Sequence, residues 1–285
     1  MTNSDVNMVC NNVANRVELT HKNAHFGRFF ICACLFFCLS PPLFAGDKAD
    51  LARICANDNF DQDVAVKTVI DGDTVILSDN RHVRLIGINT PEIGHNGEAS
   101  QPGAKAAREF LVDLFKTNKS LRLKYDRVKT DKYGRTLAHL FLPDGTSLES
   151  LILQRGLATT LTIPPDLDLL DCYQQSQQHA IDAGIGLWTL EQYQAIPVSR
   201  INRQDTGYRI ISGVVKHVGE SRTAIWINLT DDVVLKINRE NLQYFGPDDL
   251  HNLPGKDVIA RGWLYYFNHQ YRMQIHHPVD LKLVN

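Results

Sequence analysis

Short runs of aliphatic and β-branched residues recur between residues 64 and 188, and stretches with helical spacing separate them. The runs VAVKTVI, TVILS, HVRLIGI, SLRLKY and TLAHLFL are typical of strands that bury one face. Helical spacing occurs at about 103–116, 147–155 and 166–183. The Asp71-Gly72 pair between the first two runs predicts a tight hairpin. The pattern predicts an α+β catalytic domain over about residues 60–195.

A second β-rich region follows the first. About five strand-like runs lie between Tyr208 and Val284, and Gly213 and Gly262 stand where a small barrel could bend. Residues 239–254 are expected to be irregular or helical. The segment 189–207 loses its periodicity, so we expect a linker at 196–207 and a small OB-like β-barrel at 208–285, an accessory domain.

The N-terminal region has the pattern of a targeting segment. Residues 29–45, FFICACLFFCLSPPLFA, form an uncharged run after Arg28 that Pro41 and Pro42 interrupt. The unbroken part is shorter than the ~20 residues that a bilayer span needs. Residues 1–45 are therefore expected to be a signal peptide cut near Ala45, which exports the chain to the periplasm or the medium without stable membrane association. An uncleaved membrane anchor is the alternative.

Cysteine usage agrees with export but leaves the pairing open. Four of the six cysteines lie before residue 46, so only Cys55 and Cys172 remain after cleavage. They could form one disulfide in an oxidising compartment or stay as two thiols. The sequence does not decide between these alternatives.

The charge balance excludes a polybasic nucleic-acid coat. Without residues 1–45 the chain carries 27 basic and 30 acidic residues, a net charge of −3. Phosphate recognition would have to come from local clusters. The stretch RLKYDRVKTDKYGR, residues 122–135, is such a basic cluster, although a solvated pair of strands would also explain it.

Three short motifs in the first region carry more specific information. IDGDTV at 70–75 places Asp73 on the predicted hairpin, RLIGINTPE at 84–92 has an arginine at one end and an acid at the other, and TDKYGR at 130–135 adds a second arginine beside a turn glycine. Each motif alone is weak. In this order and spacing, with LILQRGLA at 151–158, they closely resemble the staphylococcal nuclease (thermonuclease) family, from about Val64 to Trp188.

The resemblance implies a five-stranded OB-type barrel with three helices and a Ca²⁺-dependent hydrolysis of phosphodiester bonds in DNA and RNA. By the same resemblance Asp73, Asn89 and the carbonyl of Thr90 would hold Ca²⁺, whose preferred ligands are hard oxygens. Glu92 would be the general base. The remaining matches are Arg84 and Arg135 as phosphate clamps, and Tyr133 and Lys132 as substrate-binding residues, with a packed turn tyrosine as the alternative at 133.

Two positions depart from the family pattern. Asn89 stands where relatives usually carry an aspartate, so one ligand brings no charge and we expect weaker Ca²⁺ binding. Thr162 and Pro164 stand where the family has nucleotide-contacting tyrosines, so no base-binding role is carried over. Asn89 also motivates the alternative function, a nucleic-acid-binding protein built on an inactive nuclease barrel.

The second region is rich in aromatic residues on its last strands. Trp263, Tyr265, Phe267 and Tyr271, with Arg261 and Arg272, could stack on and neutralise a single strand. Because strand residues alternate between two faces, about half of them must be core. Nucleic-acid binding and a purely structural role remain open here, as does the oligomeric state.

Overall fold

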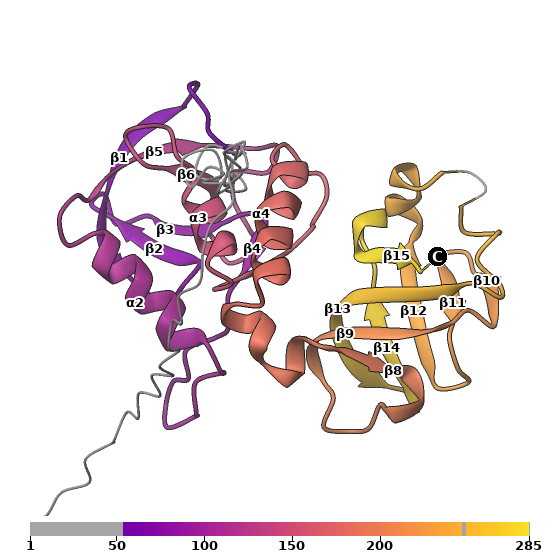
Figure 1. Ribbon diagram of the computed structural model, residues 1–285. Coiled ribbons are helices and arrows are strands. Elements are labelled where there is room, and N and C mark those ends of the chain that lie inside the picture. The colour runs from indigo at the N-terminus through magenta and orange to yellow at the C-terminus, as the bar shows by residue number, and fades with distance from the viewer. Residues whose placement is uncertain (1–53, 247–248, 285) are drawn as a thin grey trace, which may run out of the picture. The chain divides into compact units, whose positions relative to one another are not determined.

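A computed structural model describes residues 54–246 and 249–284 (Figure 1). The expected signal peptide at 1–45 lies outside the described residues. Within those residues, no helix has the length and apolar character needed to cross a membrane.

The first part of the chain folds into a closed five-stranded barrel in the order β1-β2-β3-β6-β5. Its alternating strands bury a core that includes Val75, Val83, Leu85 and Leu123. The barrel strands are β1 (Gln62–Val69), β2 (Thr74–Leu77), β3 (His82–Leu85), β5 (Ser120–Lys124) and β6 (Thr136–Phe141).

One bent strand closes this barrel. The first half of β1, from Gln62 to Ala65, pairs with β5, and its second half, from Val66 to Val69, pairs with β2 across a register shift. The β1–β2 pairing confirms the hairpin predicted at Asp71-Gly72. The neighbours β3 and β6 run parallel. A further antiparallel pair joins β4 (Ile88–Asn89) to β7 (Thr159–Thr160).

Three helices of seven or more residues accompany the barrel in the described part of the chain, which confirms the expected α+β class: α2 (Ala104–Leu114), α3 (Leu148–Gln154) and α4 (Leu170–Ala183). The hydroxyl of Ser147 caps α3 by accepting from the backbone N–H of Ser150 at 3.2 Å. The helix α4 begins four residues later than the spacing predicted. Before the helix, Ile163 and Asp166 form an isolated bridge, and the N–H of Leu170 donates to the carbonyl of Leu167 at 3.0 Å in a turn.

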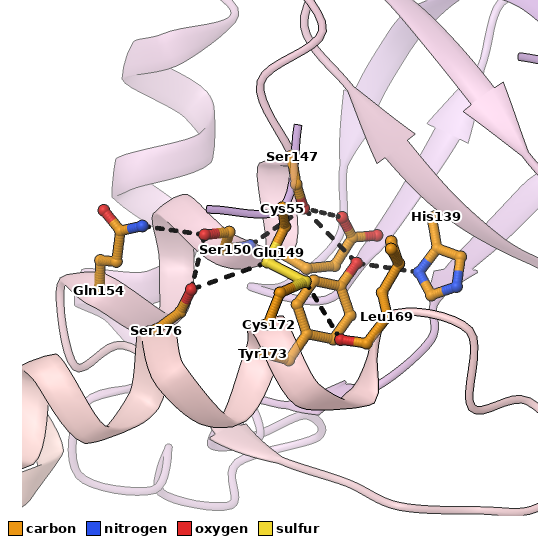
Figure 2. Close-up of a disulfide and its surroundings, with 10 residues drawn as sticks. All are labelled: Cys55, His139, Ser147, Glu149, Ser150, Gln154, Leu169, Cys172, Tyr173 and Ser176. Atoms are coloured by element: carbon orange, nitrogen blue, oxygen red, sulfur yellow. Dashed lines mark hydrogen bonds between the residues drawn. A yellow bond between two sulfur atoms is a disulfide. The ribbon is translucent and has the colours of Figure 1, made fainter. Parts of the chain in front are cut away.

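Cys55 and Cys172 form a disulfide that joins the residues ahead of β1 to α4, with 5.4 Å between their Cα atoms (Figure 2). This resolves the alternative that the sequence left open. Beside it, the fully buried Glu149 accepts hydrogen bonds from the N–H of Leu140 at 2.9 Å and the hydroxyl of Ser147 at 3.1 Å. Burial raises the pKa of Glu149, while these donors lower it in part. The disulfide therefore fixes α4 covalently, and the buried polar contacts hold the start of α3 against β6.

The remaining residues form an eight-stranded sheet in the order β10-β11-β12-β14-β13-β9-β8, with β15 paired to β13. Its strands are β8 (Ala195–Pro197), β9 (Gly207–Val214), β10 (His217–Glu220), β11 (Ala224–Asn228), β12 (Val233–Asn238), β13 (Asp257–Phe267), β14 (Gln270–Gln274) and β15 (Leu281–Leu283). Short 3₁₀ turns lie at Gly186–Thr189, Glu191–Tyr193, Val198–Arg200, Arg239–Tyr244 and Pro278–Asp280.

This second sheet repeats the strand order of the first barrel. Only two residues separate β9 from β10, and β9 pairs with β13 while β10 pairs with β11. Counted as one bent strand, β9 and β10 correspond to β1, because together they pair with β11 on one side and β13 on the other and so close the order into a ring. The parallel pair β12–β14 corresponds to β3–β6. The region is therefore OB-like in topology, as expected.

The number of strands differs from the expectation of about five. The bend at Val215 divides one strand into two, and the short β8 and β15 extend the sheet. β8 overlaps the segment predicted as linker and pairs in parallel with β9, so part of that segment belongs to the second sheet. The aperiodic sequence there reflects the shortness of β8, because three residues are too few to show an alternation.

Candidate active site

The hairpin between β1 and β2 places a buried carboxylate at the start of β2. The side chain of Asp71 accepts a hydrogen bond from the N–H of Asp73 at 3.0 Å, which fixes the turn. A Cβ on Gly72 would lie 2.6 Å from the Cβ of Ala107 and 2.7 Å from a methyl carbon of Thr90. Glycine therefore lets the turn pack closely between α2 and the chain after β4.

Both oxygens of Asp73 have partners. One accepts from the N–H of Thr90 at 2.7 Å and from its hydroxyl at 3.0 Å. The other accepts from the hydroxyl of Thr74 at 3.1 Å and lies 3.2 Å from Nε of Arg84. Asp73 and Thr90 are only 3% and 2% exposed, so these bonds are shielded from water. Asp73 thus ties the hairpin to the segment that begins the TPE motif.

Arg84 is held in one orientation by acceptors from three positions. Nη1 donates to the carbonyl oxygens of Leu85 and Ile88, the second at 3.0 Å, and Nη2 donates to Oδ1 of Asn89 at 3.2 Å. Its side chain is 12% exposed. An ordinary outward-facing strand arginine would be solvated, so this one is a partly buried, preorganised cation beside Asp73.

The amide of Asn89 bridges two of the other predicted site groups. Its Oδ1 accepts from Arg84, and its Nδ2 donates to the carbonyl oxygen of Thr90 at 3.2 Å. Two of the predicted metal ligands, Asn89 and the Thr90 carbonyl, are therefore hydrogen-bonded to each other. An aspartate at this position could accept from Arg84 but could not donate to the carbonyl.

Glu92 lies just beyond this cluster with an exposed side chain. Its backbone is fixed, because its N–H donates to Oε1 of Gln101 at 3.0 Å and its carbonyl accepts from the N–H of Gln101 at 3.0 Å. A rigid backbone with an accessible carboxylate suits a group that must take a proton from water.

Asp71 is a further candidate site residue that the family resemblance did not supply. Burial, the nearby Asp73 and, more weakly, Glu92 raise the pKa of Asp71 to about 6, while Arg84 opposes the shift. The signal was present in the sequence, since Asp71 and Asp73 both belong to the DGD turn. Above about pH 6, where Asp71 is ionised, the three carboxylates and one guanidinium carry an excess of two negative charges.

A second cluster lies on the turn before β6. Nε of Arg135 donates to Asp131 at 2.7 Å, and the same carboxylate accepts from the backbone N–H groups of Tyr133 and Arg135. Partial burial alone would raise the pKa of Asp131, but these hydrogen bonds lower it. Tyr133 is 73% exposed. Nζ of Lys132 lies 5.0 Å and the guanidinium carbon of Arg135 5.7 Å from its ring centre. Tyr133 is therefore not a packed turn residue.

The sheet register relates the two clusters. Arg84 on β3 lies opposite Leu137 on β6, two residues after Arg135. Continuing the alternation of β6 back to Arg135 puts it on the same face as Arg84, roughly 5 Å away across the strands and roughly 7 Å along them. Among the described residues, no hydrogen bond or ion pair joins the two clusters directly. The structure therefore brings Asp73, Arg84, Asn89 and Thr90 together, and places Arg135 beside them by register.

The donor set fits a hard divalent cation. Asp71 and Asp73 supply carboxylates, Asn89 an amide oxygen and Thr90 a carbonyl oxygen, and the local excess of negative charge would be balanced by such an ion. The described residues contain no cluster of three or more His, Cys, Asp and Glu side chains with metal-binding geometry. The ligand set predicted from the sequence, Asp73, Asn89 and the Thr90 carbonyl, differs from such a cluster because it includes an amide oxygen and a peptide oxygen.

Fold and site together define a class: an OB-type barrel with three helices that carries a buried carboxylate, a fixed arginine and an exposed glutamate in one region of the barrel. The model of the family described as Staphylococcal nuclease homologue matches residues 82–190. The chain belongs to the staphylococcal nuclease family, because it is 39% identical to a thermonuclease of which it covers 74%.

Individual relatives agree with this assignment. A thermonuclease of Staphylococcus intermedius is 39% identical over 126 residues, which are 43% of this chain and 74% of that protein. A thermonuclease of Staphylococcus hyicus is 33% identical over 132 residues, 45% of this chain and 77% of that protein. The SPbeta prophage-derived endonuclease YokF of Bacillus subtilis is 30% identical over 136 residues, 46% of this chain and 45% of that protein.

Proposed function

We propose that this chain is a nuclease that hydrolyses phosphodiester bonds of DNA, RNA or both. The observation that carries the proposal is the cluster in which Asp73, Arg84, Asn89 and Thr90 bind one another beside the exposed Glu92. Family membership and the relatives named thermonuclease and endonuclease support it.

The chain's own residues divide the work. Glu92 accepts a proton from the attacking water, because it is the accessible carboxylate of the site. Arg84, already oriented by its carbonyl acceptors, donates to the phosphate oxygens as their negative charge grows. Arg135 reaches the same phosphate from the turn before β6 after exchanging part of its pairing with Asp131, and Lys132 and Tyr133 contact the neighbouring backbone of the substrate.

Calcium is the proposed cofactor, held by Asp73, Asn89 and the Thr90 carbonyl with Asp71 close by. When bound, it would neutralise phosphate charge and favour deprotonation of the water. The oxygen-only donor set supports Ca²⁺ rather than zinc, which prefers nitrogen and sulfur ligands.

Cleavage of labelled single-stranded DNA and RNA, with Ca²⁺ or with a chelator, tests this proposal. We expect metal-dependent cleavage by the wild type and a loss of at least a hundredfold with Glu92→Gln, the range expected when a general base is removed. Glu109→Gln is the matched control, since Glu109 is an exposed glutamate on α2 outside the site. Binding of the strands without metal-dependent cleavage would instead support the binding-protein alternative.

Export is proposed as well. The Cys55–Cys172 disulfide supports it, because such bonds persist mainly in oxidising compartments. N-terminal sequencing of protein recovered from the periplasm or medium would test it, with Gly46 expected as the first residue. Recovery of the uncleaved chain in the membrane fraction would contradict it.

A further inference from the structure

We propose that one outer face of the second barrel binds single-stranded nucleic acid, independently of the catalytic cluster. The face, called here the aromatic face, consists of side chains from four adjacent strands of the sheet: Trp226, Lys236, Trp263, Tyr265, Phe267 and Arg272.

Strand alternation shows which aromatic residues of β13 and β14 face the core and which face outward. Leu264 and Met273 are opposite each other in the register and fully buried, so they face the core. Trp263 and Phe267 occupy the other parity and are 54% and 59% exposed. Tyr271 is only 6% exposed and belongs to the core. Two large aromatic side chains on the outer face thus remain open to solvent, which is unusual without a partner.

The register shows that the face is continuous across four strands. Trp226 on β11 lies opposite Lys236 on β12, and Lys236 lies opposite Gln274 on β14. Arg272, two residues before Gln274, lies opposite Tyr265 on β13. Four adjacent strands span roughly 14 Å at the usual strand spacing, which leaves room for more than one base.

Two cations are built into this surface between the rings. The guanidinium carbon of Arg272 lies 5.2 Å from the ring centre of Trp226 and 5.1 Å from that of Phe267, and Nζ of Lys236 lies 5.7 Å from the Trp226 ring. Nη2 of Arg272 donates to Gln270, while its buried Nε has no hydrogen-bond partner. Arg272 therefore packs against both rings.

The charge of the face favours an anionic partner. No ion pair with a carboxylate joins Lys236 or Arg272 in the part of the chain that the structure describes. On β11, β12 and β14 the other outward positions are neutral, among them Asn228, Val234, Gln270 and Gln274, whereas β13 carries the exposed Asp257 at its far end, six residues before Trp263. Arg261, which the sequence also suggested, is paired with the buried Asp280 at 3.4 Å and does not contribute.

Exposed aromatic rings combined with unpaired cations match the chemistry of a single strand. Bases stack on the rings, and phosphates contact the cations. In a duplex the base faces are already stacked and are not accessible. This preference distinguishes the aromatic face from a purely electrostatic surface, which would bind duplexes as well.

The test is metal-free binding by the full chain carrying Glu92→Gln, in a chelator, followed by fluorescence anisotropy. The probes are labelled 15-nucleotide single strands of DNA and RNA and a 15-base-pair duplex. We expect Trp263→Ala and Phe267→Ala each to weaken single-strand binding by about five- to a hundredfold. Arg272→Ala should weaken it and also reduce the slope of log affinity against log salt by about 0.7.

Two control variants lie off the face. Val214→Ala removes an aliphatic side chain of β9 that is 47% exposed, and Arg239→Ala removes an exposed cation paired with Glu220. Neither should change binding by more than about twofold. Circular dichroism establishes that each variant is folded, and Arg272→Lys, which keeps the charge but not the planar fork, should lose less affinity than Arg272→Ala.

Unchanged affinity in the three alanine variants, or equally tight binding of the duplex, would overturn the proposal. Light scattering measures self-association. If the three alanine variants lost self-association but kept strand binding, the face would be an interface between copies of the chain, and the proposal would be overturned. Because no cleavage is required, failure of the nuclease proposal would leave this result interpretable. In an active chain, Trp263→Ala should raise KM for a 30-nucleotide strand and leave kcat for a dinucleotide unchanged.

Discussion

Asp73 and Thr90, separated by 17 residues, are joined by two hydrogen bonds to a single carboxylate oxygen. One comes from the backbone of Thr90 and one from its hydroxyl. A threonine at this position therefore does more than offer a carbonyl to a cation: it fixes the direction of the carboxylate that the proposed site depends on.

Replacing this threonine tests its positioning role. Thr90→Val keeps the shape and the backbone bond but removes the hydroxyl bond to a buried charge. We expect a loss of about 2 kcal/mol in the free energy of unfolding, measured by urea denaturation. Thr223→Val, at an exposed turn position, is the control and should change little. Equal stability of the two variants would show that the Thr90 hydroxyl contributes nothing.

The Asn89 position tests the expected weakness of metal binding. Asn89→Asp adds a charge to the ligand set and removes the bond from Nδ2 to the Thr90 carbonyl. We expect the Ca²⁺ concentration for half-maximal activity to fall by about tenfold, because ligand charge strongly tunes calcium sites. The metal-free variant should be less stable than the wild type by about 1 kcal/mol. An unchanged or higher Ca²⁺ requirement would contradict this account.

The disulfide should contribute measurably to stability. Reduction of Cys55–Cys172, or the double variant Cys55→Ser with Cys172→Ser, should lower the free energy of unfolding by about 2–5 kcal/mol. Urea titrations with and without reductant measure the effect. The double variant serves as its own control, since reductant should no longer change its midpoint. A wild type insensitive to reductant would contradict the prediction.

Asp280 should make the stability of the chain depend on pH. Burial raises the pKa of its carboxyl from 3.8 to about 6, although Arg261 opposes the shift. The folded chain therefore binds more protons than the unfolded chain between about pH 4 and 6. From this group alone, the free energy of unfolding falls as pH rises through that window, by roughly 3 kcal/mol, and is constant above it.

Asp280→Asn should remove this contribution. The wild type minus variant difference in unfolding free energy, measured from pH 4 to 7, should therefore decrease as pH rises towards 6. Asp257→Asn, an exposed carboxylate at the start of β13, is the control. A difference that is flat for Asp280→Asn would show that its carboxyl is not perturbed.

Much of the architecture follows from local pattern. The alternation of VAVKTVI and TVILS, with Asp71-Gly72 between them, was sufficient for the first hairpin, and helical spacing located α2 and α3 to within two residues. These features depend on neighbours in sequence, and so the sequence displays them.

Features that depend on distant segments were less accessible. The pairing of Cys55 with Cys172 spans 117 positions, and nothing local records it. Arg261 is paired rather than free because of Asp280, which lies 19 positions further along the chain on the turn Pro278–Asp280. For the same reason, the motif placed Asp73 in the site but not the partly buried Asp71, although both belong to the same turn, because the interactions of Asp71 with Glu92 and Arg84 come from other segments.

The Cys55–Cys172 bond also determines how the catalytic barrel would behave once damaged. It closes a covalent ring that contains all five barrel strands, α2 and α3. A protease that cut any single loop inside this ring would produce two chain ends but no separate fragments. A nicked molecule would remain one covalent unit, with both halves of the site still attached to each other.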